Sequence, residues 1–265
     1  MKNRNKFNEL QEEKGVSVVI PTYNRPDYLE RLLKTIENQT VKVDEVIVVN
    51  DNSNNLQEYQ KVIDQFKVKL NIKYFVNSEN KGAPYCRNKG IQETQYSLIA
   101  LTDDDDEWMP EKIERQASYF QDNVGLVYTW GHAVDEEGKT LYEFQGQGEN
   151  TNLKELLETN FIPSSSVMVA KRAIMKNKGF DLRFPSVQDW DMWVRIIKSG
   201  YEYKVVREDL LIYHKHERES IGGSPKAKLG YKLFYKKHFL MYCRYFLNRK
   251  DYGVIIRAIQ YIFNK

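Results

Sequence analysis

Residues Val43 to Asp51 read "VDEVIVVND", and their pattern indicates the fold class. Its apolar residues are continuous from Val46 to Val49 instead of alternating with polar ones. A strand with this pattern is typical of a sheet that helices cover on both faces. Because parallel strands need long crossovers to join them, the stretch predicts an α/β domain with a parallel sheet.

The segments on both sides of this strand alternate between strand and helix patterns. Before it, "VSVVIP" (residues 16–21) indicates a strand that a proline ends, and residues 25–39 carry leucines at helical spacing, with Pro26 in the first turn. After it, we expect a helix over 56–66, a strand over 72–77, a helix over 84–94 and a strand over 96–103. This order predicts a doubly wound, mainly parallel sheet flanked by helices.

The composition suits one large globular domain or two small ones. The chain has 265 residues, of which 41% are hydrophobic and 13% aromatic, which is enough to fill a core. No apolar run approaches the roughly 20 residues that span a bilayer, and the N-terminal residues lack the apolar centre of a signal peptide. We therefore expect a cytoplasmic protein in which Cys86 and Cys243 are reduced thiols.

The positive charge of the chain is concentrated at its C-terminus. Residues 226–265 carry ten Lys/Arg against the single acid Asp251, a net charge of +9, whereas the whole chain sums to +3. Aromatic residues recur in this segment at intervals of mostly three and four, which predicts helices. We therefore expect a polar leader over 1–15, a main domain over 16–225 and a basic, aromatic, helical tail over 226–265.

The tail admits two interpretations. Its aromatic side chains could pack on the main domain while its lysines face water, or its basic face could contact an anionic membrane. No nucleic-acid recognition fold accompanies the basic residues, so nucleic-acid binding is not expected.

Polar clusters follow three of the expected strands, at the carboxyl ends where ligands bind in open α/β sheets. They are "TYNR" (22–25), "NDNS" (50–53) and "TDDDD" (102–106). The fold therefore gathers Thr22, Tyr23, Asn24, Asp51, Ser53 and the aspartates around one crevice. No G-x-G-x-x-G follows the first strand and the sequence contains no P-loop motif, so phosphates need a metal or cationic side chains instead.

The four aspartates at positions 103–106 repel one another unless a cation lies among them. Oxygen ligands with positions left open for phosphate are typical of Mg²⁺ or Mn²⁺. An EF-hand is not expected, because Trp108 stands where its sixth position needs glycine. The alternative is that these acids cap a helix, which suits Asp106 best but does not explain the whole run.

Five segments carry a resemblance to a known family. In order, they are "VSVVIPTYNRPDYLERLLKTIENQT", "DEVIVVNDNSNN", "NKGAPYCRNKGI", "LTDDDDEWMPEKI" and "QDWDMWVRI". Together they resemble the signature segments of family 2 glycosyltransferases of the GT-A fold, from about Val16 to Ser220. The resemblance implies transfer of a sugar from a nucleoside diphosphate, commonly UDP, with inversion at the anomeric carbon and a bound Mn²⁺ or Mg²⁺.

The resemblance also implies roles for the polar clusters. Asp51 matches the residue that accepts from the uracil N–H, although it could be an ordinary turn residue. Arg87 matches an arginine that faces the nucleotide, and its alternative is an exposed helix arginine. The remaining implied donor contacts are Pro21, Thr22, Tyr23, Asn24 and Arg25.

Within the acid run, Asp103 matches the family's ribose-side aspartate and Asp105 its metal ligand. Asp104 falls at the variable middle position between them, and it blurs the register because some members use adjacent aspartates, so it is kept among the donor contacts. Asp106 matches a position that supports the fold.

The resemblance places the catalytic base at Asp189, and the alternative for this residue is a helix N-cap. Its neighbour Asp191 is expected to be structural, favoured by the helix dipole. His216 resembles a family histidine that reaches the metal or the diphosphate, and Arg218 could stabilise the leaving group.

The expected function is an inverting, metal-dependent glycosyltransferase that moves a sugar from a UDP-sugar to a hydroxyl of a glycan or lipid-linked glycan, in cell-surface polysaccharide or glycoconjugate assembly of the bacterial type. Its place would be the cytoplasm, peripherally on the membrane if the tail binds lipid. The alternative is a catalytically silent nucleotide-sugar-binding or partner subunit. A sugar nucleotidyltransferase is not expected, because strand one ends in "PTYNR" instead of a glycine-rich loop.

Overall fold

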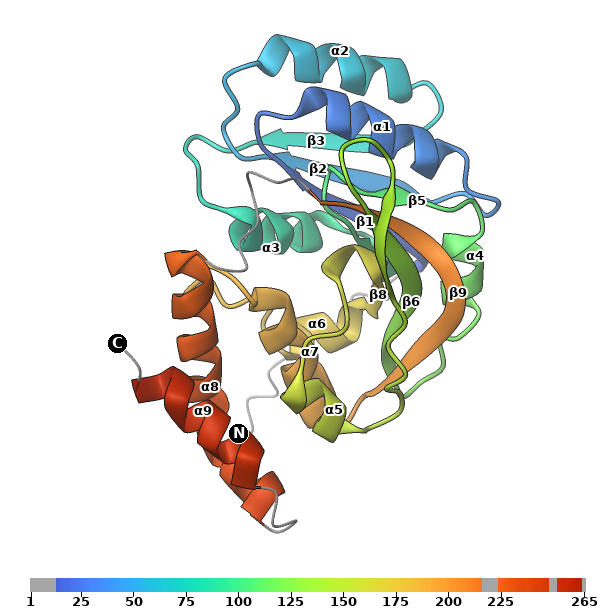
Figure 1. The fold of residues 1–265 in the computed structure, drawn as a ribbon. Coiled ribbons are helices and arrows are strands. Elements are labelled where there is room, and N and C mark those ends of the chain that lie inside the picture. The colour runs from blue at the N-terminus through green and yellow to red at the C-terminus, as the bar shows by residue number, and fades with distance from the viewer. Residues whose placement is uncertain (1–12, 216–223, 248–251, 264–265) are drawn as a thin grey trace, which may run out of the picture.

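The computed structural model describes residues 13–215, 224–247 and 252–263, which form an α/β fold around one curled sheet (Figure 1). The strands are β1 Glu13–Thr22, β2 Glu45–Asn50, β3 Ile72–Val76, β4 Tyr96–Leu101, β5 Glu107–Trp108, β6 Val124–Val134, β7 Thr140–Phe144, β8 Val167–Ala170 and β9 Glu202–His214. The helices are α1 Pro26–Glu37, α2 Leu56–Phe66, α3 Ala83–Glu93, α4 Lys112–Ala117, α5 Leu153–Glu158, α6 Lys171–Lys176, α7 Gln188–Lys198, α8 Pro225–Leu247 and α9 Tyr252–Phe263, with a 3-10 turn at Ser164–Ser166.

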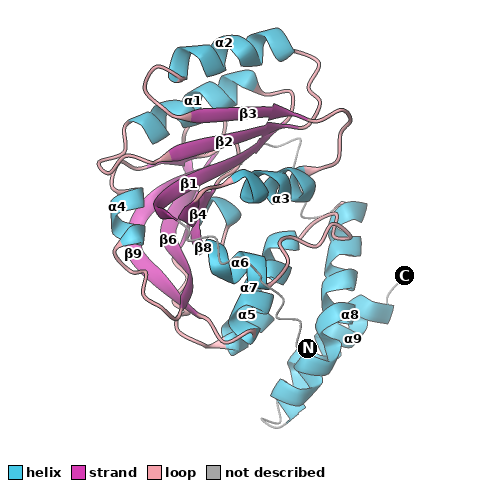
Figure 2. Cartoon of the chain, turned by 180° about the vertical axis from the view of Figure 1, so that it is seen from behind, coloured by secondary structure: helices cyan, strands magenta, loops and turns pink. Residues whose placement is uncertain are grey.

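The first half of the sheet confirms the predicted parallel α/β arrangement. Strands β3, β2, β1 and β4 are neighbours in that order, and every pair among them is parallel. Val18 and Ile20 of β1 pack with the helices α1 and α2, whereas Val19 packs on the opposite face, with α3. Figure 2 shows α1 and α2 on one side of these strands and α3 on the other. Both faces of the sheet are therefore apolar, which explains the unbroken hydrophobic runs.

The second half of the sheet contains antiparallel pairs that the sequence did not indicate. Strand β8 lies antiparallel to both β4 and β6, and β9 lies parallel to β6. The short strand β5, which directly follows the acid run, pairs antiparallel with the end of β9. This pairing brings residues after position 200 to the same region as the acid run.

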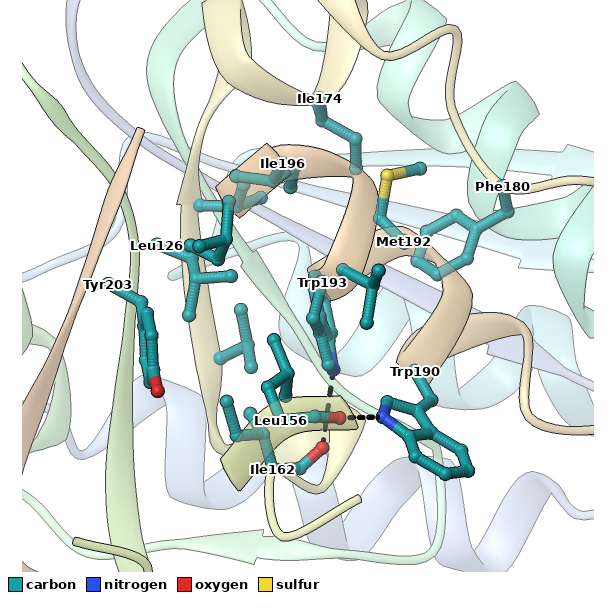
Figure 3. Packing of buried hydrophobic residues seen from close by; sticks show 14 of the residues in the cluster. Leu126, Leu156, Ile162, Ile174, Phe180, Trp190, Met192, Trp193, Ile196 and Tyr203 are labelled. Atoms are coloured by element: carbon teal, nitrogen blue, oxygen red, sulfur yellow. Dashed lines mark hydrogen bonds between the residues drawn. The ribbon is translucent and has the colours of Figure 1, made fainter. Parts of the chain in front are cut away.

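Helix α7 is fixed in the core by two indole rings of its first turns (Figure 3). The Trp190 Nε1 donates to the backbone oxygen of Leu156 over 2.5 Å, and the Trp193 Nε1 donates to that of Ile162 over 3.3 Å. Because a buried indole N–H needs a partner, these bonds select one orientation of α7 against the segment 153–163.

The tail forms two helices, as predicted, and α8 packs on α7 (Figure 1). The rings of Phe234, Tyr235, Tyr242 and Phe246 are buried in the same cluster as the residues of α7. For α8 the packing interpretation is therefore correct. The expected boundary at 225/226 stays a prediction, and β1 already begins at Glu13, inside the expected leader. Residues 1–12 lie outside the described residues.

Candidate active site

The ends of β1, β2 and β4 meet at one edge of the sheet. The backbone N–H of Asp51 donates to the Thr22 oxygen over 2.9 Å, and the backbone N–H of Thr102 donates to the Val19 oxygen over 3.3 Å. The Thr22 hydroxyl donates to Asp104 Oδ2 over 2.6 Å. The structure thus brings together the three polar clusters that follow these strands.

The loops after β1 and β2 are joined through Asn24. This residue adopts a left-handed backbone conformation with φ of 55°, which asparagine tolerates better than most residues. Its backbone N–H donates to Ser53 Oγ over 2.9 Å, and its side-chain oxygen accepts from the backbone N–H of Asn54 over 2.9 Å. Of the other expected donor contacts in this segment, Pro21 lies inside β1 and Tyr23 is exposed.

The acid run divides into two kinds of carboxylate. Asp104 and Asp106 are fully buried, whereas the side chains of Asp103 and Asp105 keep 33% and 15% of their area exposed. Burial raises the pKa of Asp104 to about 7, against the nearby Arg25, which lowers it. Burial, with the charges of Asp105 and Asp103, raises the pKa of Asp106 well above its usual range. Asp103 and Asp105 are therefore the members that a ligand can reach.

Arginines already compensate this acid run. Arg25 places Nη2 at 2.7 Å from Asp104 Oδ1 and Nη1 at 2.8 Å from Asp105 Oδ2. Arg87, which is 3% exposed, pairs with Asp103. The expected contact of Asp104 with the donor is not favoured by this geometry, because its carboxylate is enclosed by Thr22 and Arg25.

Asp51 holds the loop that precedes α3. Its two oxygens accept the backbone N–H groups of Lys81 over 2.9 Å and Gly82 over 2.6 Å, and Asn77 Nδ2 over 2.8 Å. Gly82 has φ of 84°, a left-handed conformation that glycine adopts without strain. Asp51 therefore stabilises a turn, which is the alternative that the sequence left open. Its contact with the nucleobase stays a prediction.

A cavity of about 350 Å³ opens beside Asp103, Arg87 and Asp189. Four aromatic side chains line it, and they come from three segments: Tyr142 and Phe144 from β7, Phe161 from the loop after α5, and Tyr213 from β9. Within the described residues, Arg87 Nε and Nη1, Ser164 Oγ and Gln188 Oε1 are buried without a hydrogen-bond partner, and all three residues line this cavity. Buried polar atoms of this kind need a ligand or water.

Asp189 stands at the start of α7, on the wall of this cavity. Its Oδ2 accepts from Asn160 Nδ2 over 3.3 Å, and its Oδ1 accepts from the backbone N–H of Trp190 over 2.8 Å. Burial raises the pKa of Asp189 above its usual value, against the lowering by Trp190 and Arg87. The chain enters α7 through Val187, whose φ of 53° is strained for a β-branched residue.

His216 and Arg218 lie outside the described residues. The neighbouring His214 is described: its backbone N–H donates to Asp106 Oδ1 over 3.2 Å, and its Nε2 lies 2.8 Å from Glu107 Oε1. It links the end of β9 to the acid run. Sequence reasoning did not find this link, since the signal is a pairing of two strands that are about 100 residues apart.

Of the cavity residues outside the acid run, only Arg87 and Asp189 were named as functional from the sequence, although the resemblance implies an acceptor pocket formed in part by the segment near Thr140 to Pro163. The sequence pattern does place Tyr142 and Phe144 together, because positions i and i+2 of a strand point to the same side. No sequence pattern groups Asn160 with Gln188, because only the folding of separate segments brings them together.

Comparisons with known proteins show the family of this chain. The sequence model described as Glycosyl transferase family 2 matches residues 17–179, more than half of the chain. The glycosyltransferase MJ1057 of Methanocaldococcus jannaschii is 32% identical over 238 residues, which cover 84% of this chain and 81% of that protein. The chain belongs to glycosyltransferase family 2.

Two relatives of this glycosyltransferase carry more specific names. The GalNAc(5)-diNAcBac-PP-undecaprenol beta-1,3-glucosyltransferase of Campylobacter jejuni is 30% identical, over 82% of this chain and 71% of that protein. The putative teichuronic acid biosynthesis glycosyltransferase TuaG of Bacillus subtilis is 26% identical, over 75% of this chain and 78% of that protein.

Two solved structures share the fold. TarS 1–349 of S. aureus in complex with UDP-GlcNAc aligns with a TM-score of 0.71 at 16% identity, over 94% of this chain and 81% of that chain. The mannosyltransferase PcManGT of Pyrobaculum calidifontis, in complex with GDP-Man and Mn²⁺, aligns with a TM-score of 0.68 at 15% identity, over 95% and 74% of the two chains. The predicted family and fold are confirmed.

Proposed function

We propose that this glycosyltransferase transfers a sugar from a UDP-sugar to an acceptor hydroxyl, with inversion, during assembly of a cell-surface polysaccharide or glycoconjugate. One observation carries the proposal: Asp103 of the acid run and Asp189 line the same cavity. A direct displacement needs a leaving-group side and a base on opposite faces of the sugar.

The donor lies, in this proposal, across the carboxyl ends of β1, β2 and β4. The base of the nucleotide contacts the segment around Tyr23 and Asp51, and the sugar extends toward the cavity. Two neighbours of the same fold are in complex with UDP-GlcNAc and with GDP-Man, which supports a nucleotide-sugar donor. We choose UDP because Asp51, an acceptor of N–H groups in this structure, suits the uracil N–H.

The acid run fits a divalent cation. Asp105 and Asp103 offer partly exposed oxygens, and burial, together with the charges of these two carboxylates, raises the pKa values of Asp104 and Asp106. The described residues contain no group of three ligand side chains, but Mg²⁺ and Mn²⁺ do not need one when diphosphate oxygens complete the shell. We therefore place the ion on Asp105, next to Asp103, with His216 as a further expected ligand. When bound, such an ion neutralises charge on the departing diphosphate.

Side chains of the protein bind the donor, accept the proton and orient the base. Arg87 has two buried nitrogens facing the cavity, where they can bind an anionic oxygen of the donor. Asp189 accepts the proton of the attacking hydroxyl, and its raised pKa brings its basicity closer to neutral pH. Asn160 orients the Asp189 carboxylate through Oδ2.

The acceptor enters, in this proposal, through the aromatic part of the cavity. Sugar rings present C–H faces that pack on aromatic rings, while their hydroxyls can bond the unpartnered Ser164 and Gln188 oxygens. A relative at 30% identity has a name that specifies an undecaprenol-linked glycan. We propose a glycan acceptor, carried on a lipid.

A membrane contact by the tail is consistent with such an acceptor. Among the described residues, no helix is long and apolar enough to cross a bilayer. On α9, however, four apolar side chains repeat at positions i, i+4, i+7 and i+11 and are 40–74% exposed: Tyr252, Ile256, Ile259 and Phe263. Residues 225–247 and 252–263 contain seven Lys/Arg and no Asp/Glu. Because apolar insertion and cationic charge together favour anionic lipid, we propose that this apolar stripe of α9 lies on an anionic membrane.

The first experiment is a calorimetric titration of the protein with UDP, GDP, CDP and TDP, each with and without Mn²⁺. We expect UDP to bind only with the metal, and Asp105→Ala to abolish that binding, because the carboxylate charge is lost. Asp64→Ala, an exposed acid on α2, is the control and should bind like the wild type. UDP binding followed by release of UDP from UDP-glucose or UDP-GlcNAc supports the enzyme. Binding without turnover of any UDP-sugar supports the silent subunit instead.

A further inference from the structure

Among its contacts, helix α8 reaches the turn that carries the candidate base. We propose that α8 is a positioning element of the reaction, and that His238, with Phe234, holds the first turn of α7 so that Asp189 faces the cavity. The inference rests on the role proposed for Asp189. It assigns a function to the basic, aromatic tail that is independent of any membrane.

The residue after Asp189 is clamped between two elements. The Trp190 ring stacks on Phe234 of α8, with ring centroids 3.9 Å apart and planes inclined by 17°. On its other side, the Trp190 Nε1 is bonded to the Leu156 oxygen of α5. Tyr231 and Tyr235, from the same face of α8, meet the Trp190 ring edge-on, with centroids 6.2 Å away in each case. Rotation of α7 would break all these contacts, so α8 limits that rotation.

The second residue after Asp189 is a fully buried carboxylate that α8 neutralises. His238 Nε2 lies 2.9 Å from Asp191 Oδ1, and Lys237 Nζ lies 2.7 Å from the same oxygen. Arg195, one turn later in α7 itself, places Nε at 2.8 Å from Asp191 Oδ2. A buried charge needs such partners, and two of the three come from α8. The sequence expectation that Asp191 is structural agrees with this arrangement.

The chain that enters α7 is also pressed against α8. A Cβ at Gly230 would lie 2.1 Å from Ser186 Oγ and 2.8 Å from the Ser186 oxygen, so α8 can approach only because residue 230 is glycine. Ser186 Oγ donates to the Lys226 oxygen over 3.1 Å. Val187, the next residue, holds a left-handed conformation that persists only where neighbours enforce it.

These contacts surround Asp189 on both sides along the chain. Ser186 and Val187 before it, and Trp190 and Asp191 after it, are held in place. The Asp189 carboxylate itself accepts hydrogen bonds from Asn160 Nδ2 and from the backbone N–H of Trp190. Since a misplacement of about 1 Å can cost a hundredfold in rate, loosening this turn should lower turnover without touching the donor.

The test compares full-length His238→Leu with His238→Gln, which keeps an N–H donor, and with Phe246→Leu. Phe246 is buried near the far end of α8 in the same cluster, so its variant controls for lost stability. For each variant we would measure Mn²⁺-dependent UDP binding by calorimetry, kcat for UDP release from UDP-glucose or UDP-GlcNAc, and hydrogen exchange of the peptide spanning residues 186–194.

For His238→Leu we expect kcat to fall about tenfold, UDP affinity to stay within twofold, and exchange in residues 186–194 to become faster. His238→Gln should recover most of kcat, and Phe246→Leu should keep kcat although its Tm falls. The inference is overturned by wild-type kcat in His238→Leu, by an equal loss in Phe246→Leu, or by unchanged exchange at the turn. If His238→Leu does not fold, Lys237→Met takes its place, with the same expected and contrary results.

Asp189→Asn, assayed beside these variants, separates the two proposals. If it retains wild-type kcat, the role of the base is wrong and the proposed mechanism fails with it. If it is inactive while His238→Leu and Lys237→Met turn over normally, the mechanism stands and only the positioning role of α8 fails.

Discussion

At the scale of single residues, the acid run shows how neighbouring aspartates acquire different environments. Alternate members of the run turn inward and outward: Asp104 and Asp106 are buried, and Asp103 and Asp105 reach the site. The inward pair supports the turn through Thr22 and the backbone of His214. The predicted need for positive charge is met in this structure by Arg25 and Arg87, and the partly exposed Asp103 and Asp105 are the candidate ligands.

The buried Asp104 should make stability depend on pH. Its pKa is about 7 in the folded protein and near 3.8 in the unfolded chain, so the folded state binds the proton more tightly. The contribution of Asp104 to the free energy of unfolding is fully present below pH 3.8 and is lost as the pH rises toward 7. We expect Asp104→Asn to reduce the fall in the free energy of unfolding between pH 5 and pH 8, measured by urea denaturation. Asp64→Asn should leave the fall unchanged, and an unchanged fall in Asp104→Asn contradicts the assignment.

Replacing the candidate base should separate chemistry from binding. We expect Asp189→Asn to lower kcat by about 10²–10⁴, the usual contribution of a general base, with little change in UDP affinity. Because burial raises the pKa of Asp189, the acid limb of the kcat profile of the wild type should lie above the usual range of an aspartate. Steady-state UDP release across pH measures both effects. Wild-type turnover by Asp189→Asn is the result that excludes this base.

At the scale of elements, α8 and α9 differ although both are rich in aromatic and apolar residues. Helix α8 directs Phe234, Tyr242 and Phe246 into the core cluster that it shares with α7. One side of helix α9, which includes Ala258, is buried in the protein. The apolar stripe of Tyr252, Ile256, Ile259 and Phe263 stays exposed. The packing interpretation of the tail thus applies to α8, and the membrane contact stays a proposal for α9.

Polar substitution of the α9 stripe should weaken binding to anionic vesicles. For Ile256→Gln with Ile259→Gln and Phe263→Gln, we expect at least a tenfold loss of sedimentation with phosphatidylglycerol vesicles, because the apolar area that enters the lipid is removed. The control carries Val41→Gln and Val68→Gln, which are exposed apolar residues in the first half of the chain. Binding of the wild type should fall with salt. Equal binding of both variants, or a dimer of the wild type that the triple variant abolishes, would show another role for the stripe.

At the scale of the whole molecule, α8 belongs to the core that supports the site. Each buried ring of α8 contributes about 3–5 kcal/mol, whereas a whole domain is stable by only about 5–15 kcal/mol. The combined contribution of four buried rings therefore exceeds the free energy of unfolding of a typical domain. These rings are those of Phe234, Tyr235, Tyr242 and Phe246.

A chain that ends at Ser224 should for this reason lose cooperative unfolding, followed by near-ultraviolet circular dichroism on heating. A chain that ends at Leu247 lacks only α9 and should keep a cooperative transition at a lower Tm, since Val254, Ile255 and Ala258 no longer cover α8. A transition of the shorter chain close to that of the full protein would show that residues 16–225 fold as an independent domain.

The local pattern of the sequence was sufficient to predict the parallel half of the sheet, the strand-end clusters and the family. Hydrophobic periodicity and strand-to-helix alternation depend on a few neighbouring residues. The apolar run of Val18, Val19 and Ile20, for example, indicates that both faces of the sheet are covered. Tertiary structure alone decided the antiparallel second half, the arginine partners of the acid run, the aromatic cavity and the docking of α8 on α7. These features depend on contacts between segments tens to more than a hundred residues apart, such as Thr22 with Asp104 and His214 with Asp106. No local pattern encodes such contacts, because packing and burial select them only when the whole chain has folded.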